Sequence, residues 1–400
     1  MSSITTLIVL SFLLVLTVLW LSFSNENEWV SEQHGEKANM LNSNRHRHIV
    51  PSQVVIDMNT PQPVSGETTS LQMHADGKRA TVDVGKLDPP SSPYAYVTLI
   101  HGIDDTFRYR GYLYNVMIMK TALASFGSTA DFIVLLGFSQ DGNRDIFQSD
   151  INSLKDIGVR IYYLPRLVDT PRVHFGEMAL LKVTPWSFIQ YEKIQFFDGD
   201  IMPRSNMDCL FQLPQNTFNV GNASPLNSGW FLAIPNMEDF DVLRSKAVAR
   251  LRRNWDEVIG WGEVPPAWLV NAHGKHIFQK WTFNGASLDQ GLLTHYFMIN
   301  QGRVIMFNGV SGTKKYDGHG QDGRPVQITL HPCKEPTVVS MFAHFTGKSK
   351  PWLTNLRYAK KGSPLQQWGN FLDALHLPVN SSNIHLQALK PPLGYFHPNK

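Results

Sequence analysis

KIQFFDGD, residues 193–200, is an apolar run that ends on two carboxylates. Asp198 and Asp200 are separated only by Gly199, and like charges this close raise each other's pKa unless something neutralises them. A hard divalent cation would do so, because Mg²⁺ and Mn²⁺ prefer carboxylate oxygens and keep positions open for phosphate oxygens. We expect Gly199 to permit the backbone angles that turn both carboxylates toward one point, and to leave room for a close ligand. An ordinary Asp-Gly turn is the alternative.

The chain before this segment alternates apolar runs with helical patterns. Three runs predict further strands: YAYVTLI (94–100), DFIVLLG (131–137) and VRIYYLP (159–165). Apolar residues three and four apart predict a helix that ends near Gly127, and another helix is expected over residues 175–190. Strands that alternate with helices predict an α/β fold with a parallel sheet covered on both faces. Ligands bind such sheets at the carboxyl ends of the strands, where Asp198 and Asp200 lie.

The first residues point to the secretory pathway. Residues 4–23 form an uncharged apolar run without Pro or Gly, long enough to cross a bilayer as a helix. No basic residue precedes the run and no clear cleavage pattern comes after it, so we expect an uncleaved anchor, with a cleaved signal peptide as the alternative. Glu26 and Glu28 favour a lumenal side for the rest of the chain, which predicts a single-pass type II membrane protein of the secretory pathway. Cys209 and Cys333 are able to pair there, but free buried thiols are equally compatible.

Changes in composition divide the chain into five expected parts. They are a cytoplasmic tail (1–3), a transmembrane signal anchor (4–23), a flexible lumenal stem (24–93), a catalytic domain (94–360) and a C-terminal extension (361–400). The stem is rich in Ser, Asn, Gln, Thr, Pro and His and lacks a helix or strand period. The formal net charge is +3 and no long Lys/Arg run occurs, so nucleic acid is not an expected partner. Asn380 is the expected N-glycosylation site, ahead of Asn222.

A candidate third metal ligand, His344, begins the segment HFTGKSKPW (344–352). A lone histidine after an apolar stretch is more often a core residue. Here Gly347, Lys348 and Lys350 come directly after it, and a histidine beside a lysine in a glycine loop suits a diphosphate–metal complex. The cation would bind one face of the diphosphate, and the lysine would neutralise another.

Five segments occur in the order found in one known family. They are YVTLI (96–100), the Lys-x-x-x-Trp helix with FFDGD and its Asp-x-Leu-Phe sequel (182–211), NSGWFLAIPN (227–236), LDQGLL (288–293) and HFTGKSKPW (344–352). Together they resemble glycosyltransferase family eight, the glycogenin-like retaining enzymes of GT-A (Rossmann-like) fold. The sequence departs from the family at His101-Gly102, at Ala286 and in a long insert over residues 236–283. Because of these departures, the resemblance does not identify the transferred sugar or the acceptor.

The resemblance implies a UDP-sugar donor and a Mn²⁺ ion held by Asp198, Asp200 and His344. It implies that the nucleotide sugar is bound by Leu99, Gly199, Asn227, Ser228, Gly347 and Lys350. It implies that Lys182, Asp289 and Gln290 act at the reacting centre. Arg172 matches a family arginine loosely. The plainer alternatives stay open: Asn227 and Ser228 would form an ordinary turn, and Asp289 would cap a helix. Trp186 and Trp352 are expected in the core.

The function implied is a Mn²⁺-dependent retaining transfer of a hexosyl group to a glycan, glycolipid or polysaccharide. Lys350 and the cation would stabilise charge on the leaving diphosphate. Either that diphosphate takes the acceptor's proton, or Asp289 forms a covalent glycosyl-enzyme. Two alternatives come from other classes. One is a catalytically inactive, membrane-tethered carbohydrate-binding protein on the same fold, and the other is a metal-dependent hydrolase or nucleotidyltransferase.

Overall fold

The computed structural model describes residues 68–70, 81–101, 107–138, 148–169, 175–221, 223–269, 280–307, 313–319, 325–330, 333, 341–347 and 350–375. All of them fall in one structural unit, Ser65–Lys400. The expected anchor, most of the expected stem, Arg172, Asn222, Lys348 and Asn380 lie outside the described residues. No helix in the described ranges is both long and apolar enough to span a membrane.

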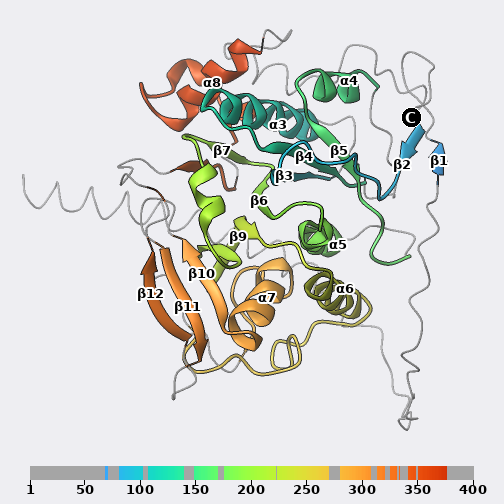
Figure 1. The fold of residues 1–400 in the computed structure, drawn as a ribbon, viewed down its shortest axis with the longest axis vertical. Coiled ribbons are helices and arrows are strands. Elements are labelled where there is room, and N and C mark those ends of the chain that lie inside the picture. Colours follow the sequence, from blue (N-terminus) through green and yellow to red (C-terminus); the bar gives the residue numbers. More distant parts are fainter. Residues whose placement is uncertain are drawn as a thin grey trace, which may run out of the picture. The chain divides into compact units, whose positions relative to one another are not determined.

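One large mixed sheet organises the described residues (Figure 1). Its nine described strands, in spatial order, are β12 (Pro325–Leu330), β11 (Thr313–His319), β10 (Arg303–Phe307), β8 (Thr217–Val220), β9 (Leu226–Ala233), β6 (Lys193–Asp198), β3 (Tyr94–Ile100), β4 (Asp131–Leu136) and β5 (Arg160–Tyr163). Two small sheets pair β1 (Thr68–Ser70) with β2 (Thr81–Asp83), and β7 (Ile201–Pro203) with β13 (Phe342–His344).

Helices cover both faces of the central strands. The α-helices are α3 (Phe107–Ser125), α4 (Gln148–Asp156), α5 (Phe175–Leu180), α6 (Met237–Leu251), α7 (Asp289–Leu293) and α8 (Pro364–Ala374). The 3₁₀ helices are η1 (Leu181–Ser187), η2 (Asp208–Gln212), η4 (Pro351–Leu353) and η5 (Leu356–Tyr358), and η3 (Thr294–Asn300) is a π-helix. Side chains of β3 alternate between two hydrophobic clusters: Val97 shares one with residues of α5 and α6, and Tyr96 shares the other with residues of α3 and α4. The α/β prediction and the two covered faces are confirmed.

The predicted parallel sheet is right for only part of the chain. β6, β3, β4 and β5 are parallel neighbours, as the alternation of strands and helices predicts. β9 runs antiparallel to both β6 and β8 and lies between them, so it joins β8, β10, β11 and β12 to the parallel strands. Its apolar run contains Gly229 and comes after a turn-rich stretch, so its sequence does not stand out as a strand.

Two local expectations need revision. The helix expected over residues 175–190 ends as α5 at Leu180 and continues as the 3₁₀ helix η1, which contains Pro185. Proline lacks the N–H that an α-helix interior requires, so it disfavours α-helix there. In addition, the end of the segment expected as stem is bound to the sheet: Gly85 N donates to Tyr163 O at 2.9 Å, and Ser91 N donates to Asp131 Oδ2 at 3.0 Å.

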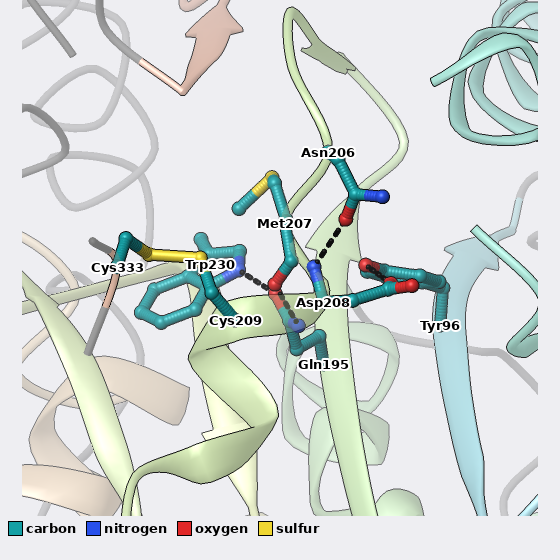
Figure 2. Close-up of a disulfide and its surroundings, with 8 residues drawn as sticks. All are labelled: Tyr96, Gln195, Asn206, Met207, Asp208, Cys209, Trp230 and Cys333. Atoms are coloured by element: carbon teal, nitrogen blue, oxygen red, sulfur yellow. Dashed lines mark hydrogen bonds between the residues drawn. A yellow bond between two sulfur atoms is a disulfide. The ribbon is translucent and has the colours of Figure 1, made fainter. Parts of the chain in front are cut away.

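Cys209 and Cys333 form a disulfide, which settles the alternative that the sequence leaves open. It joins η2 to the segment that precedes β13 (Figure 2). Beside it, Trp230 Nε1 donates to Gln195 Oε1 at 3.2 Å, and Gln195 Nε2 donates to Met207 O at 2.9 Å (Figure 2). The bond therefore ties the chain just after the Asp-Gly-Asp segment to the chain just before His344.

Serine at Cys209 is expected to lower the free energy of unfolding by about 2–5 kcal/mol, because the bond closes a long loop in the unfolded chain. Its two cysteines are 124 residues apart. Urea unfolding of the wild type and of Cys209→Ser, each with and without a reductant, measures the effect. Reductant should lower the unfolding midpoint of the wild type to that of Cys209→Ser and leave the midpoint of the variant unchanged, because the variant has no disulfide to cleave. An unchanged wild-type midpoint after complete reduction would contradict the expectation.

Candidate functional site

Three candidate metal ligands meet at the carboxyl end of β6, an interior strand of the large sheet. Asp198 ends β6, Asp200 precedes β7, and His344 ends β13. One ligand atom from each lies within 4.8 Å of the others. His344 Nε2 is 3.1 Å from Asp200 Oδ1 and 3.9 Å from Asp198 Oδ2. The structure thus brings together the three residues that the sequence analysis singles out, and all three side chains are partly buried.

Backbone pairing places His344 at this position. β7 and β13 are antiparallel, and their register sets His344 opposite Ile201. Phe345 N donates to Asp200 O at 2.9 Å and extends the pairing by one step. The histidine therefore reaches the two aspartates through a two-stranded sheet that neither segment predicts alone.

Lys350 binds the second aspartate. Its ammonium forms an ion pair with Asp200 Oδ2 and donates to Phe345 O. Burial alone would raise the pKa of Asp200, but the hydrogen bond from His344 and the charge of Lys350 outweigh burial and lower that pKa to about 2. Asp200 is therefore an anion at neutral pH.

Lys182 links the first aspartate to the expected reacting centre. Its Nζ lies 2.7 Å from Asp198 Oδ1 and 2.9 Å from Asp289 Oδ2. Burial opposes the charge of Lys182, but the two carboxylates outweigh it and raise its pKa well above the ordinary value. Burial raises the pKa of Asp198, although Lys182 opposes that shift. The network thus joins the aspartates of the Asp-Gly-Asp segment to Asp289 through one buried cation.

Asp289 does not act as a helix cap. It is the first residue of α7, the N-cap position is Leu288, and no side chain caps that end. Ser228 Oγ donates to Asp289 Oδ2 at 2.5 Å, so this carboxylate oxygen is bound by both Ser228 and Lys182. The carboxylate is held in one orientation, as a residue at a reacting centre needs to be.

The remaining predicted residues lie nearby in different settings. Asn227 and Ser228 are inside β9, not in a turn, and Asn227 Oδ1 accepts from Gly229 N at 2.8 Å. Gln290 Oε1 accepts from Ser224 Oγ at 3.1 Å, and Gln290 Nε2 donates to Asn284 O at 3.1 Å. Gln290 is thus bound to two loop segments that flank the site.

Leu99 and Gly347 differ in exposure. Leu99 pairs with Asp198 across β3 and β6, but its side chain is only 5% exposed and packs in the core. Gly347 has φ +65°, a conformation that favours glycine, and an added β-carbon would meet nothing within 4 Å. The tryptophans Trp186 and Trp352 are buried core residues, as expected.

Gly199 is packed closely by neighbouring elements. Its φ is not among the positive values found at other glycines, so its backbone angles do not by themselves require glycine. A β-carbon there would lie 3.0 Å from Tyr112 Cδ1 and 3.1 Å from Leu99 O. The glycine lets α3 and β3 pack closely against the Asp-Gly-Asp turn.

Two further residues, Gly229 and His101, lie at the site although the sequence analysis assigns neither of them a role. A β-carbon at Gly229 would lie 2.9 Å from His344 Nδ1 and closer still to Cε1, so the imidazole packs directly on the β9 backbone. His101 comes directly after β3, and burial together with the charge of Lys182 lowers the pKa of its imidazole to about 4. His101 is therefore neutral at neutral pH, beside the network of Lys182 and Asp289.

The donor set fits a divalent cation. Two carboxylates and one imidazole are ligands that divalent ions such as Mn²⁺ accept, and all three face one point. Lys350 places a positive charge beside the three ligands. A divalent cation with a lysine beside it is an arrangement that can bind phosphate oxygens.

Two plant proteins are similar to this chain in sequence. No protein-family model matches the chain. It is 24% identical over 180 residues to UDP-glucuronate:xylan alpha-glucuronosyltransferase 1 of Arabidopsis thaliana, which covers 43% of this chain and 25% of the relative. A second A. thaliana protein, provisionally named UDP-glucuronate:xylan alpha-glucuronosyltransferase 3, is 22% identical over 261 residues, or 65% of this chain and 34% of the relative. The chain thus spans about a third or less of the length of these relatives.

Among solved structures, the glycosyltransferase GlyE of Streptococcus pneumoniae TIGR4 aligns with a TM-score of 0.39 and 13% identity. The alignment covers 77% of this chain and 66% of that one. The similarity in sequence is to the two plant proteins above, both named as glucuronosyltransferases.

Proposed function

We propose that this chain is a Mn²⁺-dependent retaining glycosyltransferase that moves a hexosyl group from a UDP-sugar to a glycan, glycolipid or polysaccharide. One observation carries the proposal: Asp198, Asp200 and His344 converge beside Lys350. Two carboxylates and an imidazole hold a divalent cation, and the lysine supplies the charge that a diphosphate needs. Sequence similarity to named glycosyltransferases supports the reaction class.

Binding of the donor would use this arrangement directly. When bound, Mn²⁺ supplies Lewis-acid stabilisation of charge on the leaving diphosphate. Asp198, Asp200 and His344 hold the ion, and Lys350 neutralises the diphosphate with Gly347 beside it. The glycine has no side chain to obstruct a phosphate. In this proposal the protein contributes charges fixed in advance, which is usually the largest part of such catalysis.

In this proposal the donor sugar lies near Lys182, Ser228 and Asp289. Lys182 and Ser228 hold Asp289 in one orientation toward the reacting centre. Asn227 and Gln290 supply amide groups at the border of the reacting centre. Leu99 lies at the end of β3, where the nucleoside is expected. Two routes fit retention of configuration. Either the leaving diphosphate accepts the proton of the acceptor hydroxyl as that hydroxyl attacks the anomeric carbon, or Asp289 attacks the anomeric carbon as the diphosphate leaves and the acceptor hydroxyl displaces Asp289 in a second step.

The donor and acceptor are proposed by class. The two plant relatives are named for UDP-glucuronate and xylan, so UDP-glucuronate is the first donor to test. UDP-glucose, UDP-galactose and UDP-N-acetylglucosamine are the others. We also propose that the apolar segment 4–23 anchors the chain in the Golgi membrane, with the site on the lumenal side.

A screen of UDP-sugars tests the function. We expect Mn²⁺ with one UDP-sugar to raise the melting temperature of the full chain and that donor to be consumed with an added glycan acceptor. EDTA should abolish both effects, and excess Mn²⁺ should restore them. Release of free sugar alone would identify a hydrolase. Binding without turnover for every donor and acceptor would identify a carbohydrate-binding protein and overturn the proposal.

A further inference from the structure

The turn that carries the two aspartates is held from behind by one buried amide. Asn115 lies on α3, and its Nδ2 donates to Gly199 O and to Ile201 O, each at 2.8 Å. These two carbonyls flank Asp200 on either side. Asn115 is fully buried, so neither hydrogen bond competes with water.

A second helix fixes the amide itself. Trp368 on α8 donates from Nε1 to Asn115 Oδ1 at 2.7 Å. Trp368 is also fully buried, in a cluster that contains Ile118 of α3, Met202 of β7 and Trp352. With its oxygen bound by the indole, the amide of Asn115 keeps one orientation, and both of its N–H groups face the turn.

We propose that Trp368 and Asn115 form a positioning relay through which α8 sets the geometry of the Asp198, Asp200 and His344 site. The inference rests on the proposed function, because it assumes that the three residues bind a cation. It gives a role to residues beyond 360, which the sequence assigns to an extension. Trp368 and Asn115 are positioning residues, since neither touches the cation or the substrate.

The physical basis is the spacing of the two anchored carbonyls. Asp200 stands between Gly199 and Ile201, so fixing both carbonyls fixes its backbone, and with it the direction of its carboxylate. The carbonyl of Asp200 is bound on the other side by Phe345 N, which belongs to the strand end that carries His344. The relay thus also steadies the junction of β7 and β13. Groups that orient metal ligands in this way typically change metal affinity about 10–100-fold when removed.

Titration of the full chain with Mn²⁺ alone, monitored by the electron paramagnetic resonance signal of free Mn²⁺, tests the relay. We expect Asn115→Leu, which removes both donors at similar volume, to weaken Mn²⁺ binding about 10-fold or more. Trp368→Phe, which removes the indole N–H together with the five-membered ring but leaves Asn115 in place, should weaken binding by a smaller factor. The titrations are made under conditions where urea unfolding shows each variant to be folded. Should Asn115→Leu not fold, Trp368→Phe carries the test.

The chain offers a matched control. Trp230 donates to Gln195 Oε1, and Gln195 Nε2 donates to Met207 O, so an indole again orients an amide that binds a backbone carbonyl (Figure 2). Trp230 and Gln195 are both fully buried, but the carbonyl that Gln195 binds belongs to Met207, which does not flank a candidate metal ligand. We expect Trp230→Phe to lower stability as Trp368→Phe does and to leave Mn²⁺ affinity unchanged.

The outcomes separate the two proposals. If the wild type binds Mn²⁺ and both Asn115→Leu and Trp368→Phe bind it as tightly, the relay is overturned and the proposed function stands. Equal weakening in Trp230→Phe and Trp368→Phe would reduce the effect to general destabilisation and would also overturn the relay. If the wild type takes up no Mn²⁺ with or without a UDP-sugar, the metal site and the relay fall together.

Discussion

Asparagine in place of Asp200 is expected to abolish Mn²⁺ binding and to reduce transfer from a UDP-sugar by about 100-fold or more, the scale of removing one preorganised electrostatic group. Asp200 contacts His344 at 3.1 Å and forms an ion pair with Lys350, and those two groups hold its pKa near 2. Asparagine keeps the shape but not the charge, so the cation loses an anionic ligand and Lys350 loses its counter-ion.

Mn²⁺ titration and product analysis measure both parts of this expectation. Asp198→Asn should behave similarly, because it removes the other carboxylate of the pair. Asp156→Asn, at the exposed end of α4, is the control and should match the wild type in both assays. Normal turnover of a UDP-sugar by Asp198→Asn or Asp200→Asn would refute the metal assignment.

The parallel half of the sheet could be predicted from the sequence because its signals are local. Buried strands of a parallel sheet are continuous apolar runs, and β3 and β4 match the predicted runs within a residue. Asp198 and Asp200 stand out for the same reason, as charges directly after such a run. His344 is predictable because Gly347 and Lys350 lie within a few residues of it.

The rest depends on contacts between distant segments. β9 enters the sheet beside β6 through pairing that its own sequence does not indicate. Asn115 is one polar residue in a helix, and only the packing of α3 against the turn shows that it binds Gly199 and Ile201. The crowding that disfavours a side chain at Gly199 is likewise hidden in the sequence, because Tyr112 belongs to a helix far away along the chain.

Gly229 gives the most selective test of how the histidine is placed. Alanine there is expected to displace His344 and to weaken Mn²⁺ binding about 10-fold or more, as the loss of an oriented ligand does. A β-carbon at this position would lie 2.9 Å from His344 Nδ1 and 2.8 Å from Asn227 Oδ1, so the ring has to move. The backbone is no obstacle, since Gly229 is not among the glycines with positive φ and alanine is otherwise favoured over glycine within a strand.

Mn²⁺ titration of Gly229→Ala beside His344→Ala measures this effect, because both variants remove the imidazole from the site while only one removes the side chain. We expect the two to weaken binding to a similar extent. Gly176→Ala is the matched control: its β-carbon would meet Leu288 Cδ2 at 3.4 Å, an ordinary contact, and its affinity for Mn²⁺ should equal that of the wild type. Wild-type affinity in Gly229→Ala, with His344→Ala impaired, would show that the ring tolerates the methyl group and that the close packing on β9 does not position it. Wild-type affinity in both variants would remove His344 from the ligand set and leave the two aspartates to hold the cation without it.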